Sequence, residues 1–201
     1  MYALMKPLAV AVATLSLASN VAPSTWTVDP MHTRVGFSVR HFFTPVTGQF
    51  DAFDVSMRWD PANPSASTVT AEIEVASVNT ANAKRDTHLK SPDFFDSARN
   101  ARITFQSTSV REDTPNHLIV TGNLTIKGVS RRVELPVTVL GVKDIPAEMQ
   151  GMLGGAKRIA SFEGDLRIDR RDFGVGTGSW GETTIVGSDV DIHLQLESAL
   201  K

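Results

Sequence analysis

The amino-acid sequence predicts an all-β fold, an extended antiparallel barrel of eight strands with a short helical cap. Apolar and polar residues alternate along one segment after another, which is typical of half-buried strands. Several of these segments span about nine residues, or roughly 30 Å, which is long for a small sandwich. One segment, residues 77–97, departs from the alternation and supplies the expected cap.

Eight segments carry the alternation strongly, and a shorter one lies around Trp26 and Val28. Turn signals such as "DPANPS", "REDTPNH" and "IKGVS" separate them. Strands with one apolar face form a sandwich or close into a barrel, and the strand length favours an up-and-down barrel. The residues expected to face inward are Val35, Phe37, Val39 and His41; Phe53, Val55, Met57 and Trp59; Val69, Ala71, Ile73 and Val75; Ile103 and Phe105; Leu118, Val120, Leu124 and Ile126; Val133, Leu135, Val137 and Val139; Phe162, Leu166 and Ile168; and Val190, Ile192, Leu194 and Leu196.

The interior of such a barrel is just wide enough for side chains or for one slender ligand. Because the expected inner face is almost wholly apolar, any ligand should also be apolar. The chain has ten phenylalanines and one tyrosine, and phenylalanine packs without a polar group. The sequence therefore predicts a dry interior.

The cap is expected in the segment "SVNTANAKRDTHLKSPDFFDS", residues 77–97. Asn79 or Thr80 can cap a helix there, and Ser91-Pro92 can begin a second short turn. A helix between two strands can cover a barrel mouth. Arg85 and His88 could then bind the polar end of a ligand, with Asp86 orienting Arg85.

The N-terminal residues resemble a secretory signal peptide, with one lysine followed by an apolar run and small residues. We expect cleavage after Ala18, export of the mature chain, and a single domain over residues 24–198. No later stretch is long and apolar enough for a membrane helix.

The charge and the cysteine content exclude two classes of function. The formal charge of -2 argues against a nucleic-acid partner. The absence of cysteine excludes disulfides and thiol chemistry.

Catalysis is the main alternative to binding, with His88 or His41 as acid or base and Asp86 as the orienting group. No G-x-S-x-G motif accompanies them. The five histidines show no local zinc signature, although His32, His41 and His88 could assemble in space. We therefore predict no catalytic residues, no metal ligands and no cofactor.

Six segments in order resemble one known family: "WTVDPMHTRVGFSVRH", "GQFDAFDV", "SVNTANAKRDTHLKSPDFFDS", "ITFQSTSV", "VTGNLTIKGVSRRVELPV" and "DRRDFGVG". They resemble the YceI-like, polyisoprenoid-binding family over essentially the whole mature chain. The resemblance implies a lipocalin-like barrel with a helical cap, a periplasmic location and a cavity for a long polyprenyl or similar lipid. Thr33, Arg102 and Asp169 depart from the usual family pattern.

The sequence thus predicts a periplasmic protein that binds a polyisoprenoid or similar lipid for transport, storage or stress response. An enzyme acting on a lipid, a scaffold with an incidental cavity, and a homodimer stay open as alternatives or additions. The predicted ligand-binding residues are Phe37, Val39, His41, Phe43, Phe50, Arg85, His88, Phe94, Phe95 and Trp180.

Overall fold

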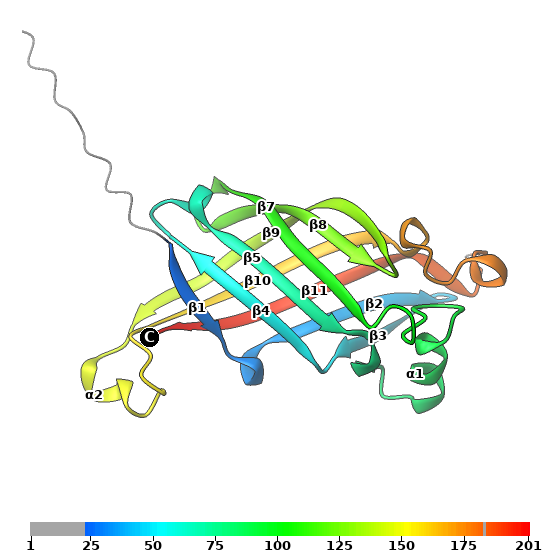
Figure 1. The fold of residues 1–201 in the computed structure, drawn as a ribbon, viewed down its shortest axis with the longest axis horizontal. Coiled ribbons are helices and arrows are strands. Elements are labelled where there is room, and N and C mark those ends of the chain that lie inside the picture. The colour runs from blue at the N-terminus through cyan, green and yellow to red at the C-terminus, as the bar shows by residue number, and fades with distance from the viewer. Residues whose placement is uncertain (1–22, 183) are drawn as a thin grey trace, which may run out of the picture.

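The computed structural model describes residues 23–182 and 184–201 as one elongated β-barrel (Figure 1). The predicted signal peptide, residues 1–18, lies outside the described residues. All strand pairs are antiparallel. The strands are β1 Ser24–Val28, β2 Arg34–His41, β3 Thr44–Phe50, β4 Phe53–Trp59, β5 Thr68–Glu74, β6 Val78–Asn79, β7 Arg102–Thr114, β8 His117–Ile126, β9 Val129–Asp144, β10 Arg158–Asp169 and β11 Val186–Leu200.

The barrel closes where β1 pairs with both β4 and β11. Three wall positions are each filled by two consecutive short strands, β1 with β2, β3 with β4, and β5 with β6, because a short irregular segment interrupts each of them. The eleven strands therefore build an eight-stranded wall in which neighbours in sequence are neighbours in space. This confirms the predicted barrel and excludes the sandwich.

The predicted alternation places apolar side chains inside the barrel. On β8, Leu118, Val120, Leu124 and Ile126 are all buried, whereas Asn123 between them is exposed. Successive side chains of a strand point to opposite faces, so burial on alternate positions fixes the register of each strand. The hydrophobic core is therefore the inner surface of the wall itself.

Strand β3 and the two-residue strand β6 have no counterpart among the predicted segments. The inward positions of β3 are occupied by Val46, Gly48 and Phe50, so the alternation is broken in the middle. A Cβ atom at Gly48 would lie 2.5 Å from the ring of Phe37 on the neighbouring β2. Glycine is therefore needed here because an aromatic ring from the next strand already fills its space.

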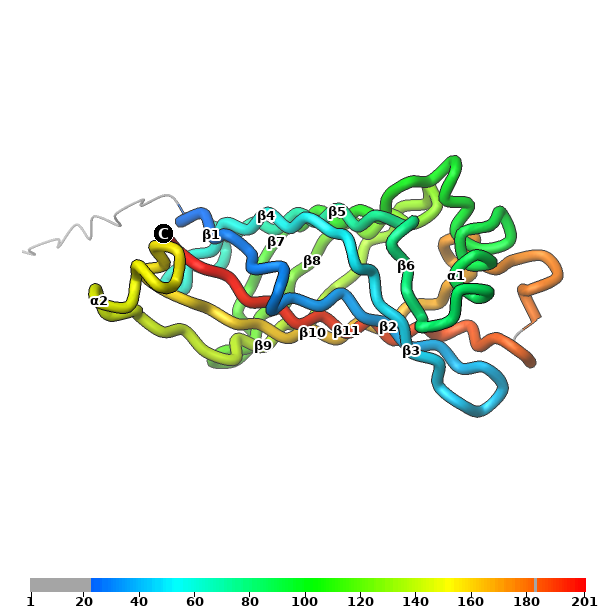
Figure 2. The backbone as a smooth tube through the Cα atoms, turned by 90° about the horizontal axis from the view of Figure 1, so that it is seen from below, coloured from blue at the N-terminus to red at the C-terminus, as the bar shows by residue number. Residues whose placement is uncertain are grey.

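The two ends of the barrel carry different additions. Helix α1 (Ala83–Lys90) lies at one end, beside the loop that contains the 3₁₀ turns η4 (Arg170–Phe173) and η5 (Gly178–Trp180), as Figure 2 shows. The short helix α2 (Ala147–Gln150) lies at the opposite end. None of the helices in the described part of the chain is long and apolar enough to cross a membrane.

The predicted helical cap exists, but it begins later than expected. Asn82, rather than Asn79 or Thr80, is the N-cap, and its side chain accepts a hydrogen bond from the amide of Arg85 at 3.1 Å. Ala81 before it has a φ of 57°, which turns the chain between β6 and the helix. Asn79 and Thr80 are instead engaged with β3 and with α1 side chains.

Candidate ligand cavity and its cap

An apolar cavity of about 280 Å³ runs inside the barrel. Its exposed lining is almost wholly carbon. Every wall position contributes inward side chains, among them Val35, Phe50, Val55, Val69, Ile103, Leu118, Leu135, Phe162 and Val190. A cavity of this kind favours an apolar guest, because a buried polar group without a hydrogen-bond partner costs free energy.

The capped end of the cavity is closed by side chains from two separate loops. Leu89 of α1 and the pair Phe94 and Phe95 come from one loop, and Phe173 and Val175 come from the other. Hydrogen bonds join the two loops: the amide of Gly176 donates to the Asp93 carbonyl at 3.0 Å. The cap is therefore a bipartite structure rather than one helix.

Five of the ten predicted ligand-binding residues line the cavity: Phe37, Val39, Phe50, Phe94 and Phe95. His41 and Phe43 do not, because β2 and β3 are joined by the two-residue turn Phe42–Phe43, where the chain projects into solvent. Phe43 is 91% exposed. The structure therefore places Phe43, predicted as a ligand-binding residue, at an exposed turn away from the cavity.

Arg85 and Asp86 also lie outside the cavity lining, and both bind the same residue, Thr80. The Arg85 Nε donates to the Thr80 hydroxyl at 2.7 Å, and its Nη2 donates to the Thr80 carbonyl at 2.8 Å. Asp86 Oδ1 accepts from the Thr80 amide at 2.9 Å and from the Thr80 hydroxyl at 2.6 Å. Asp86 thus orients Thr80, not Arg85 directly, and the group fastens α1 to the chain that follows β6.

Replacing Thr80 by valine should lower the free energy of unfolding by about 1–3 kcal/mol. Thr80 is only 6% exposed, so the groups that its hydroxyl binds would be left without a hydrogen-bond partner. Chemical unfolding would measure the change. Thr87→Val is the matched control: that hydroxyl donates to the Ala83 carbonyl on the exposed face of α1, so its loss should cost less than about 0.5 kcal/mol. Equal costs at both positions would contradict an anchoring role for Thr80.

His88 is held between two aromatic rings in the cap. Its centroid lies 5.0 Å from Phe94 and 5.0 Å from Trp180, both edge-on. Its Nε2 lies 3.0 Å from Asp93 Oδ2. Since Asp86 is engaged with Thr80 and His88 with Asp93, the Asp86/His88 pair required by the catalytic alternative does not form. Trp180 packs against the core beneath the cap but is not part of the cavity lining.

Arg170 is a central residue of the capped end that the sequence reasoning did not single out. Its side chain is 3% exposed and lies against the cavity. Its guanidinium donates to the carbonyls of Gly187, Val175, Gly176, Trp180 and Val186. Burial lowers the pKa of Arg170 from its ordinary value, yet a guanidinium keeps its proton at neutral pH. The sequence signal for it is its place in the segment "DRRDFGVG", whose glycines mark the loop that this arginine organises.

The zinc site considered for His32, His41 and His88 is not formed. His32 precedes β2 and His41 ends it, and nine residues of extended chain place them roughly 30 Å apart. His88 lies in the cap with its ring between Phe94 and Trp180.

Comparisons with known proteins agree with this architecture. Protein YceI of Escherichia coli O157:H7 is 37% identical over 167 residues, which are 83% of this chain and 81% of that protein. The crystal structure of Burkholderia cenocepacia BcnA is 30% identical, has a TM-score of 0.75, and covers 85% of this chain and 98% of its own. A polyisoprenoid-binding domain from Saccharophagus degradans, implicated in plant cell wall breakdown, shares the fold at 15% identity, with a TM-score of 0.64 over 89% of this chain and 99% of that one. Residues 26–198 match the model of the YceI-like domain, and the chain belongs to that family, as its motifs predict.

Proposed function

We propose that the protein binds a long-chain lipid, a polyisoprenoid or a comparable amphiphile, inside its barrel. The observation that carries the proposal is the apolar cavity inside the barrel, to which every wall position contributes apolar side chains. The family and the polyisoprenoid-binding neighbour of the same fold support this ligand class. The signal-like N-terminal sequence supports a periplasmic location, where the protein would carry or store the lipid.

Binding, rather than catalysis, fits the chemistry of the lining. An apolar chain gains about 0.8 kcal/mol for each methylene group removed from water, less the cost of ordering the chain. The lining offers almost no polar surface that could activate a bond. The polar end of an amphiphile would therefore lie at the barrel mouth, and the chain would leave the site chemically unchanged.

The direct test is the identity of the lipid that accompanies the gently purified protein. Mass spectrometry of an organic extract should yield a long apolar chain in near-stoichiometric amount. Protein stripped of lipid should take up an added polyprenyl alcohol and return it intact. Recovery of no lipid together with no uptake would sink the proposal, and recovery of a cleaved or oxidised product would favour an enzyme.

Affinity should also increase with the length of the ligand chain. For a series of linear alcohols, the dissociation constant should fall about fourfold per added methylene until the cavity is full, because each buried methylene contributes about 0.8 kcal/mol. Displacement of a fluorescent fatty probe would measure it. The variant Phe43→Ser, changed at the solvent-exposed turn, should reproduce the same series; no dependence on length would show that the chain is not buried.

A further inference from the structure

One of the three interruptions of the barrel wall is the 3₁₀ turn η1 (Pro30–His32) between β1 and β2. Pairing of β1 with β11 ends at Val28 and Ser198, and pairing of β2 with β11 resumes at Arg34 and Gln195. The residues between them do not continue the ladder. The chain at this point is held to β11 by other contacts.

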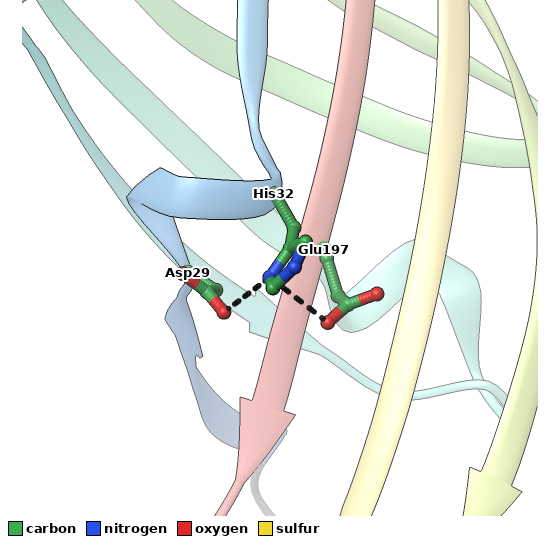
Figure 3. Close-up of side chains that lie close together, drawn as sticks. All are labelled: Asp29, His32 and Glu197. Atoms are coloured by element: carbon green, nitrogen blue, oxygen red, sulfur yellow. Dashed lines mark hydrogen bonds and ion pairs between the residues drawn. The ribbon is translucent and has the colours of Figure 1, made fainter.

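Three side chains with metal-binding atoms converge on this break (Figure 3). His32 Nδ1 lies 2.8 Å from Asp29 Oδ2 and 3.8 Å from Glu197 Oε1. One ligand atom from each residue lies within 4.8 Å of the other two. Asp29 is the N-cap of η1 and His32 is its last residue, whereas Glu197 comes from β11, so the cluster bridges η1 and β11.

The second oxygen of each carboxylate is held by a different partner. Asp29 Oδ1 accepts a hydrogen bond from the Met31 amide at 2.9 Å, and Glu197 Oε2 accepts one from the Ser161 hydroxyl at 3.4 Å. The backbones are also joined, since the Asp29 amide donates to the Glu197 carbonyl at 2.9 Å. These contacts direct the two remaining oxygens toward the same imidazole nitrogen, as the outer partners of metal ligands do.

We propose that Asp29, His32 and Glu197 form a binding site for a divalent transition-metal ion of the zinc type. One imidazole nitrogen, two carboxylate oxygens and a water complete a tetrahedral set that suits Zn²⁺. Metal–ligand bonds of 2.0–2.2 Å place tetrahedral ligand atoms about 3.4 Å apart. The separations of 2.8 and 3.8 Å bracket this value, so small side-chain rotations would admit the ion.

A proton bridges the same atoms when no cation is bound. The hydrogen bond that His32 Nδ1 donates to Asp29 Oδ2 raises the pKa of His32 and lowers the pKa of Asp29. The ion would replace this proton with a stronger bridge from η1 to β11. Because it binds only the folded wall, it stabilises the barrel in proportion to its occupancy.

Zinc chloride, titrated calorimetrically into untagged, chelator-treated protein, should bind at a single saturable site. At a hundredfold excess over the dissociation constant, the melting temperature should rise by roughly 5–10 °C. Cobalt(II) should give the intense visible absorption of a tetrahedral site. His32→Gln and Glu197→Gln should each weaken zinc binding at least tenfold.

The chain offers a matched control in His193, whose Nδ1 lies 2.5 Å from Asp165 Oδ1. That pair also lies on the barrel exterior, but one carboxylate rather than two accompanies the imidazole in the ion pair. His193→Gln should leave zinc affinity unchanged. Absence of saturable binding, or equal binding by all three variants, would overturn the proposal. So would a His32→Gln melting temperature lowered equally with and without zinc, since that is the result for a hydrogen-bonded contact alone.

Discussion

Replacing Arg170 by methionine is expected to lower the free energy of unfolding by at least about 3 kcal/mol. Methionine keeps much of the volume but removes every donor from a side chain that is 3% exposed. Five backbone carbonyls would lose their partner. Each acceptor left buried and unpaired costs about 1–3 kcal/mol, so even partial access of water leaves a large deficit. Thermal unfolding should show a fall of roughly 6–12 °C.

Arg167→Met is the control for this prediction, on the same end of β10. Arg167 is exposed and makes an ion pair with Asp191 at 2.6 Å. An exposed pair contributes about 0–1 kcal/mol, so this variant should unfold close to the wild-type midpoint. Arg170→Lys should fall between the two, because an ammonium group retains the charge but cannot copy the planar set of five donors. Indistinguishable stabilities for Arg170→Met and Arg167→Met would refute the role assigned to Arg170.

Loss of Arg170 should also loosen the cap before the rest of the barrel. The loop that it binds is joined to the other half of the cap by Lys127, whose Nζ donates to the carbonyls of Pro92 and Gly174, both at 3.0 Å. Strands β8, β9 and β10 are held by long ladders that do not involve this loop. Hydrogen exchange at the Gly176 amide should therefore accelerate more than exchange at the centre of β8.

The barrel could be predicted from sequence because its inner and outer surfaces differ so consistently. Along β4, Met57 and Trp59 are buried while Arg58 between them is exposed, and a shift of one residue would reverse both. Such a pattern depends only on the nearest neighbours along a strand. It can therefore be recognised in the sequence before the pairing of the strands is known.

Features that depend on residues distant in sequence could not be predicted in this way. Gly48 replaces an inward side chain only because Phe37 occupies its space from the adjacent strand. The hairpin turn at Phe42 has a φ of 51°, whereas the usual sequence signal for such a turn is Asn-Gly or Asp-Gly. Both positions show a local sequence preference overridden by the surrounding structure.

The polar residues of the cap illustrate the same limit. Arg85, Asp86 and His88 lie close together in the sequence, which suggested that they belong to one site. In the structure, Arg85 and Asp86 both form hydrogen bonds with Thr80, whereas His88 is paired with Asp93. The path of the backbone determines which groups a long polar side chain can reach. Here the turn at Ala81 sets that path. Composition therefore located the cap without revealing its internal contacts.

The second large effect is expected from Ala71→Trp, which should weaken binding of a long-chain lipid at least tenfold. Ala71 lines the cavity from β5, between Val55 and Phe105 on the neighbouring strands. An indole at this position would occupy space that the lipid chain needs. Because it enters an open cavity rather than a packed core, the fold should lose less than about 1.5 kcal/mol.

Thr70→Trp separates this occlusion from the general effect of an added indole. Thr70 is the preceding residue of the same strand and faces solvent, so its variant should bind lipid as the wild type does. Probe displacement would give both affinities, and circular dichroism would show that both variants keep the barrel. Wild-type affinity in Ala71→Trp would place the ligand elsewhere, such as at the exposed turn around Phe43. A selective loss at position 71 would place the chain inside the barrel, because only an interior ligand distinguishes two neighbouring residues on opposite faces of one strand.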